Sequence, residues 1–170
     1  HLKYEQSRKM PYLALIDQLN RFVRQKSSLL IISGYSFNDD HLNDTIINAL
    51  KANPSAMVLA LMYDKYYYLD KKERYPKAYG IAKDRHNLNL WTFDKAIIGT
   101  NPGEWKKNNK DSDDDISRFV VDCPKELNPE EKETFVKLGD FAEFANFLKM
   151  LIGNKKDTKK ENKRETKDDE

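Results

Sequence analysis

Two short apolar runs on either side of a helical pattern constrain the fold of this 170-residue chain more than any other feature. The runs cover residues 28–33 and 56–62, and neither alternates apolar with polar residues. Such runs are typical of strands that are buried on both faces, as in a parallel sheet. Between them, Leu42, Ile46 and Leu50 recur at helical spacing, and Asn53 with the following proline ends the helix. This order predicts a right-handed crossover unit in an α/β sheet.

The segments around this unit give weaker signals. Pro11 fits the first turn of a helix that extends to about residue 25, because its missing N–H is not needed there. We expect a helix within residues 66–85 and a third strand at 88–91. Residues 96–99 either continue that strand or are irregular.

The C-terminal part combines polar stretches with short apolar patterns. Residues 106–115 are polar and acidic and predict a mobile loop, and residues 119–121 predict a short strand. Asn128-Pro129 is expected to open a helix that contains Phe135, Val136 and Leu138. Asp140 is expected to cap the last helix, which has an apolar stripe and ends at Gly153.

Composition excludes several classes of protein. The 30 basic residues are nearly matched by 28 acidic ones, which argues against direct binding of nucleic acid, since that needs a one-sided basic field. Cys123 is the only cysteine, so the chain has no internal disulfide and no cysteine-based metal site, as is usual in a reducing cytoplasm. No apolar run approaches the roughly 20 residues that span a bilayer. We therefore expect a cytoplasmic protein with no membrane contact and no metal.

The segment from Gly34 to Asn43 follows the first apolar run and opens the next helix. Open α/β sheets bind ligands at this position, against helix N-termini. Gly34 permits close approach of a ligand, Ser36 offers a hydroxyl, and Asp39 or Asp40 can accept from ribose hydroxyls. On these residues alone, an ordinary turn with a helix N-cap is the more common explanation. The chain has no glycine-rich phosphate loop.

A family resemblance adds to this interpretation. Gly34-Tyr35-Ser36-Phe37, followed by Asp39, His41 and Asn43, resembles the Gly-Tyr-Ser-Phe/Leu-x-Asp-x-His-Ile/Leu-Asn signature of bacterial SIR2-like (sirtuin-related) NAD-binding domains. Weaker matches follow the family's order at residues 7–12, 93–99, 103–105 and 138–141. The resemblance covers most of residues 1–153, and residues 154–170 are expected to form a disordered charged tail.

The resemblance implies a Rossmann-like parallel sheet with flanking helices, and cleavage of the nicotinamide–ribose bond of NAD. Many members of this family deplete NAD during phage infection. Gly34 and Ser36 would touch the adenosine ribose side of NAD, together with the other signature residues Tyr35, Asp39, His41 and Asn43. Asp64, at the end of the second apolar run, is a positional candidate for contact with adenine or ribose.

The family's Gly-Ala-Gly phosphate loop and its catalytic Asn and His lie upstream of any residue here. The chain begins at His1 without a start signal for a helix or strand, so we expect a partial domain whose catalytic half is elsewhere. No catalytic residue is assigned. The alternative is a non-catalytic NAD-binding or oligomerisation module, in which residues 140–152 dock on a sister subunit or on a partner defence protein.

Other polar and aromatic residues have two interpretations each. Tyr63 and the three tyrosines of residues 66–68, interleaved with lysines, could stack nucleobases, although packing at the core and its rim is more common. His86 is expected to be a solvated loop residue. The carboxylates of residues 111–115 lack the spacing of a calcium loop.

Overall fold

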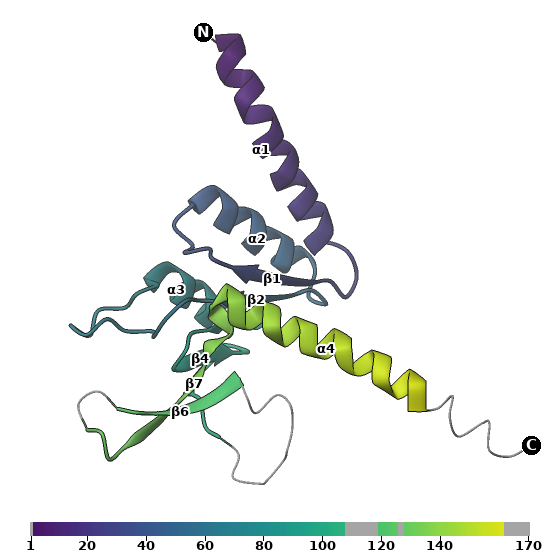
Figure 1. Cartoon of the computed structure of the whole chain (residues 1–170). Helices are drawn as coiled ribbons and strands as arrows, with labels where there is room; N and C mark the ends of the chain where they lie inside the picture. The colour runs from purple at the N-terminus through teal and green to yellow at the C-terminus, as the bar shows by residue number, and fades with distance from the viewer. Residues whose placement is uncertain (1, 108–118, 126–127, 162–170) are drawn as a thin grey trace, which may run out of the picture.

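The computed structural model describes residues 2–107, 119–125 and 128–161 of the chain (Figure 1). Its main sheet has five strands in sequential order: β1 (Leu29–Ser33), β2 (Met57–Leu61), β3 (Leu88–Trp91), β4 (Lys95–Ile98) and β5 (Asn101–Glu104). A second, two-stranded sheet contains β6 (Val120–Pro124) and β7 (Lys132–Val136). The helices are α1 (Leu2–Val23), α2 (Asp40–Ala52), α3 (Pro76–Asp84) and α4 (Phe141–Glu161), with a 3₁₀ turn η2 (Lys137–Gly139) before α4.

The first three strands form the parallel unit that the apolar runs predict. β1 pairs with β2 and β2 with β3, all parallel, and Ser33 lies opposite Leu61. α2 connects β1 to β2 and ends at the expected residue, since Asn53 forms its C-cap. β4 and β5 continue the sheet in antiparallel orientation. The chain is thus a mixed α/β protein whose sheet is compatible with a Rossmann-like fold.

One face of the sheet is covered by α2 and α3. The core on this face consists of small and branched side chains at less than one-tenth exposure: Ile46, Ala49, Leu50, Val58, Ala60, Ala78, Ala82, Leu88 and Leu90. The alanines of α3 let its backbone lie close to β3. The buried Asn53 amide donates to the carbonyl oxygens of Val23 and Gln25, at 2.8 and 2.7 Å, and so fixes the end of α1 beside α2.

A second, more aromatic core lies on the opposite face. Leu61, Phe119, Val136 and Leu138 form it, and Trp91, Trp105, Phe144 and Phe147 pack around them. Gly139 lies so close to the end of β2 that a Cβ atom at this position would be 1.9 Å from the carbonyl oxygen of Met62. No side chain fits there, so glycine at position 139 allows the start of α4 to pack directly on the sheet.

The half of this face near β1 remains uncovered by the described residues. The side chains of Leu29, Ile31 and Met57 are 51%, 38% and 46% exposed, and register places them on the same face as Leu61. β1 also pairs only with β2 among the described strands. The expectation that both faces of β1 are buried is therefore wrong for this face, because α4 covers only the part of the sheet around β2 and β3.

Several helix boundaries differ from the prediction. α1 begins at Leu2, so Pro11 lies inside it instead of in its first turn. α3 is limited to Pro76–Asp84, because residues 66–74 form an irregular loop closed by a bridge between Tyr67 and Glu73. α4 does not end at Gly153 but continues to Glu161, so the backbone of the first residues of the expected disordered tail is helical. Figure 1 shows α1 and α4 projecting beyond the sheet at their far ends.

Two predicted elements have the wrong type. The helix expected after Asn128-Pro129 is strand β7, which pairs with β6 along its full length and buries Phe135 and Val136. Residues 96–98 neither continue β3 nor are irregular, since they belong to β4, and Gly99 begins the turn to β5. β4 runs back along β3 after a hydrogen-bonded turn between Thr92 and Lys95.

The remaining expectations are either confirmed or untested. The strand expected at residues 119–121 is confirmed as part of β6, and Asp140 caps α4 through hydrogen bonds from the amides of Ala142 and Glu143 at 2.8 and 3.4 Å. Most of the predicted loop at 106–115 lies outside the described residues. Within the described residues, no helix is both long and apolar enough to cross a membrane.

Candidate functional site

The Gly34–Asn43 segment connects the carboxyl end of β1 to α2, as predicted. Gly34 has a φ of +74°, a conformation that favours glycine, and a Cβ at this position would meet no atom within 4 Å. Phe37 also has a positive φ, of 59°, and is fully buried. The buried phenylalanine anchors the turn, while Gly34 leaves open space above the end of the strand.

Hydrogen bonds inside the segment involve Tyr35 and Asn43. The Asn43 side chain is buried and its amide donates to the carbonyl oxygen of Phe37 at 2.8 Å. The Tyr35 hydroxyl shares its proton between Asn43 Oδ1, at 2.7 Å, and the carbonyl oxygen of Asp39, at 2.9 Å. Burial, followed by the nearby Asp39 carboxylate, raises the pKa of Tyr35. Both side chains therefore hold the turn in shape and have little capacity left for a ligand.

Asp39 is the N-cap of α2. Its Oδ1 accepts from the amide of Leu42 at 3.1 Å, and its Oδ2 accepts from the Tyr12 hydroxyl of α1 at 3.1 Å. The Leu42 amide is the main reason why the pKa of Asp39 lies below its ordinary value. Each carboxylate oxygen has a second lone pair, so Asp39 can still accept from a hydroxyl group of a ligand.

Gly34, Ser36, Asp39 and His41 are the exposed members of the signature. The Ser36 hydroxyl accepts from the Asn38 side chain at 3.1 Å and retains its own proton for donation. The His41 side chain lies on the outer surface of the first turn of α2. Ser36, Asp39 and His41 are therefore the signature side chains that are available for contact with a ligand.

Asp64 lies in the loop after β2, on the same carboxyl edge of the sheet as Gly34. It has a positive φ of 72°, and its carboxylate accepts from the Lys65 amide at 2.7 Å and pairs with Arg74 at 3.1 Å. Its carbonyl oxygen accepts from the amide of Phe93 at 3.0 Å. Asp64 thus stabilises the loop after β2, and one of its carboxylate oxygens is already in an ion pair.

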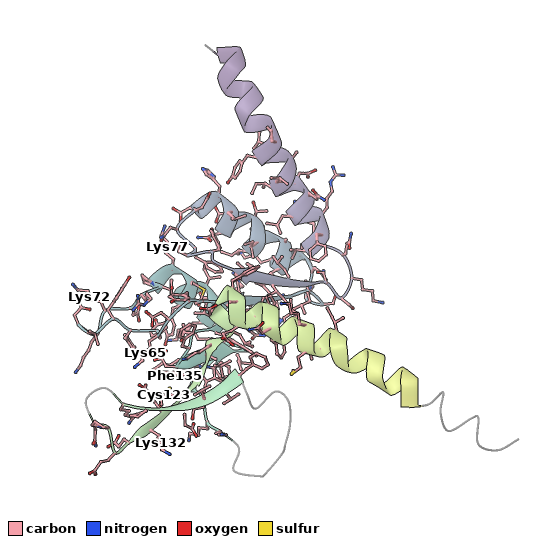
Figure 2. The ribbon with its side chains drawn as sticks, in the orientation of Figure 1. Lys65, Lys72, Lys77, Cys123, Lys132 and Phe135 are labelled. Atoms are coloured by element: carbon pink, nitrogen blue, oxygen red, sulfur yellow. The ribbon has the colours of Figure 1, made fainter. Side chains whose placement is uncertain are left out.

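A groove of about 410 Å³ borders the segment, between α2 and α3. Asp40 and Asn43 line it from α2, and Lys77 and Arg85 line it from the other side. Lys77, which Figure 2 shows beside α2, forms an ion pair with Asp40 at 2.7 Å. Two carboxylates, Asp39 and Asp40, begin α2, so this helix N-terminus suits hydroxyl groups better than phosphates.

The open end of the strand offers space and polar groups for a ligand that carries hydroxyl groups. Gly34 leaves the space, Ser36 provides a donor and Asp39 an acceptor. No phosphate-binding loop occurs in the sequence. In the part of the chain that the structure describes, no three His, Cys, Asp or Glu side chains form a group that could hold a metal ion.

The sequence did not predict which side chains bind the three aspartates of the site. Tyr12, Lys77 and Arg74 bind Asp39, Asp40 and Asp64 respectively, and no contact between these residues was predicted. The signature has no counterpart for them, so only the fold could reveal these contacts.

Comparison with known proteins gives no family assignment. The sequence matches no family model, and no curated protein is significantly similar to it. The resemblance to SIR2-like domains therefore stays a prediction from the signature residues.

Proposed function

We propose that this chain forms part of a SIR2-like NAD hydrolase, and that its Gly34–Asn43 segment binds the adenosine half of NAD. The observation that carries the proposal is the open turn at Gly34, which has exposed Ser36 and His41 beside it at the carboxyl end of a parallel strand. Ligands of open α/β sheets bind at this edge. In this proposal NAD is the substrate, and the enzyme acts in the cytoplasm in defence against phage.

The catalytic residues in this proposal come from sequence that packs against β1. The apolar residues Leu29, Ile31 and Met57 are exposed on one face, although β1 has the unalternated sequence of a strand buried on both faces. An added strand and helix at this edge would bury them and would bring further groups next to Gly34. Those groups would supply the nicotinamide end of the site.

Cleavage of NAD, followed by release of nicotinamide, tests this proposal. The assay compares this chain with the longest natural protein that contains it, and the proposal expects activity in the longer form. In that protein, Ser36→Ala should lower kcat/KM for NAD about 3- to 10-fold, the effect of one lost hydrogen bond to an uncharged group. Ser27→Ala, at the exposed opposite end of β1, is the matched control and should have no effect.

Cleavage at the parental rate by the Ser36→Ala variant would contradict the site assignment. Asp39→Ala is a less direct test, because Asp39 also caps α2 and binds Tyr12, so its loss affects folding. Its NAD kinetics are therefore compared at equal fractions of folded protein.

A second candidate function is a non-catalytic NAD-binding or assembly module, most simply a homo-oligomer or a complex with another defence protein. The outer part of α4 exposes Leu148, Leu151 and Ile152, at 37%, 43% and 66%. Exposed apolar side chains of this kind mark contact surfaces. This candidate predicts an oligomer in which Ile152→Lys lowers the association state, together with no NAD cleavage in either form of the protein.

A further inference from the structure

A pocket of about 240 Å³ lies on the α3 side of the sheet, away from the Gly34–Asn43 segment. We name it the tyrosine pocket, after Tyr66, Tyr67 and Tyr79 in its wall. Strand register places Leu90, Ile97 and Pro102 side by side across β3, β4 and β5, and all three line the pocket. The pocket thus has aromatic walls and an apolar floor, which suit a flat aromatic ring.

The three rings are packed at angles that leave the outer one partly open. Tyr66 lies in the middle and is only 2% exposed, with ring centroids 4.6 Å from Tyr67 and 4.7 Å from Tyr79. Tyr67 is 39% exposed, and the Lys95 ammonium lies 5.0 Å from its ring centroid. A base entering the pocket would therefore meet the exposed ring of Tyr67 first.

The Tyr66 hydroxyl is buried and has no hydrogen-bond partner among the residues that the structure describes. Burial raises the pKa of Tyr66, and the Glu73 carboxylate raises it further. Buried polar groups in proteins are nearly always bonded, and an exception often marks the place of a ligand or a water molecule. A bound ring with a polar edge would supply the missing partner.

A second, polar hollow of about 600 Å³ adjoins the tyrosine pocket and shares Tyr67, Lys95 and Glu104 with it. We name it the lysine groove, because Lys106, Lys107 and Lys132 also line it. Figure 2 shows Lys132 on the two-stranded sheet, below Lys65 and Phe135.

In the lysine groove, the carboxylates have bonding partners, whereas three of the lysines form no ion pair with a described residue. Glu133 is held by Lys65 at 2.7 Å, and Asp122 accepts from Thr134 at 2.9 Å. Among the described residues, no carboxylate forms an ion pair with Lys106, Lys107 or Lys132. Glu104 is paired with Lys95 at 3.4 Å, and Asp94 accepts from the Tyr66 amide at 2.7 Å, so each carboxylate that lines the groove has a partner. The groove therefore offers cationic groups to an anion, directly beside an aromatic pocket.

We propose that the tyrosine pocket and the lysine groove together form a nucleotide-binding site. The base lies among the tyrosines, and the phosphate lies against Lys106, Lys107 and Lys132. The volumes agree with this division, because about 240 Å³ is below the roughly 300 Å³ of a complete small-molecule site, whereas the groove adds the space for ribose and phosphate. This site is separate from the Gly34–Asn43 segment and does not depend on the proposed NAD cleavage.

Titration of the full chain with AMP tests the proposal, with binding followed by calorimetry or by ligand NMR. Saturable binding is expected, and Tyr67→Ala should weaken it about ten-fold, since one base–aromatic stack is lost. Tyr68→Ala is the matched control, because Tyr68 is the adjacent, similarly exposed tyrosine and does not line the pocket. It should bind AMP as the parent does.

A variant at the surface of the lysine groove tests the contact with the phosphate without changing the residues of the tyrosine pocket. The double variant Lys106→Gln/Lys107→Gln should weaken AMP several-fold and adenosine little, and the AMP affinity of the parent should fall as salt is raised. Lys71→Gln/Lys72→Gln, on the exposed loop, is the control.

Three results would overturn the proposal. The first is the absence of saturable AMP binding at millimolar concentration. The second is equal AMP affinity in the parent and in the Tyr67→Ala and Lys106→Gln/Lys107→Gln variants. The third is binding that is lost in Ser36→Ala but kept in Tyr67→Ala, which would place AMP at the Gly34–Asn43 segment and would support the proposed NAD site instead.

Discussion

The Gly34–Asn43 segment and the tyrosine pocket differ in how their polar groups are used. In the segment, the Tyr35 hydroxyl donates to the Asn43 side chain and the Asp39 carbonyl oxygen. Asn43 donates to the carbonyl oxygen of Phe37, and the Asp39 carboxylate caps α2. In the tyrosine pocket, the buried Tyr66 hydroxyl has no hydrogen-bond partner among the described residues, and in the adjoining groove Lys106, Lys107 and Lys132 form no ion pair with them. Residues of a sequence signature can thus be used mainly to stabilise a turn. The polar groups that remain free for a ligand lie in the tyrosine pocket and the lysine groove, where the sequence has no recognisable motif.

The largest effect is expected for Asn43→Ala, which tests whether the segment is held by its own hydrogen bonds. The substitution removes the donor to Phe37 and the acceptor for Tyr35 inside a buried environment. The free energy of unfolding should fall by about 3 kcal/mol. Urea denaturation measures this change.

Asn48→Ala is the matched control for that measurement. Asn48 lies on the same helix with an exposed side chain, so its replacement should change the free energy of unfolding by less than about 0.5 kcal/mol. Equal effects of the two substitutions would show that the Asn43 hydrogen bonds do not hold the segment.

Tyr66→Phe is expected to raise the free energy of unfolding, by less than Asn43→Ala lowers it. Removal of a buried hydroxyl that has no partner should raise the free energy of unfolding by about 1 kcal/mol. AMP affinity should fall in the same variant, because the hydroxyl is the proposed contact for the polar edge of the base. A loss of stability would show instead that the hydroxyl is bonded in solution, with Glu73 as the nearest candidate.

The smallest effect concerns the pH dependence of stability through Asp39. Its pKa is lowered in the folded state, so its contribution to stability is present above the unfolded pKa of about 3.9 and is lost as pH falls through the folded value. Asp39→Asn keeps a good N-cap but does not titrate. The difference in urea midpoint between parent and variant should therefore shrink as pH falls below about 4, and a constant difference would contradict the cap assignment.

The sequence predicted the parallel unit of the sheet because its signals are local. The unalternated runs at 28–33 and 56–62 became β1 and β2, and the helix between them ended at Asn53. The positive φ at Gly34 and the helix N-cap at Asp39 were also predictable, because each depends on the type of a single residue.

The wrong predictions concern elements that depend on partners far away in the sequence. β7 was expected to be a helix, and only pairing with β6 decides its type. β5 has the sequence Asn-Pro-Gly-Glu, which lacks strand-forming side chains, and it is a strand because β4 lies beside it. The tyrosines of residues 66–68 suggested either base stacking or packing, and the pocket that they line forms only when α3 and β3–β5 come together.

The contact between Gly139 and Met62 has a mechanical consequence. A backbone carbonyl occupies the place where any side chain at position 139 would lie, so the base of α4 and the end of β2 have no compressible layer between them. Any side chain at position 139 would therefore have to separate the start of α4 from the end of β2, two residues before Asp64. The glycine thus sets how closely the helix and the carboxyl edge of the sheet can approach each other.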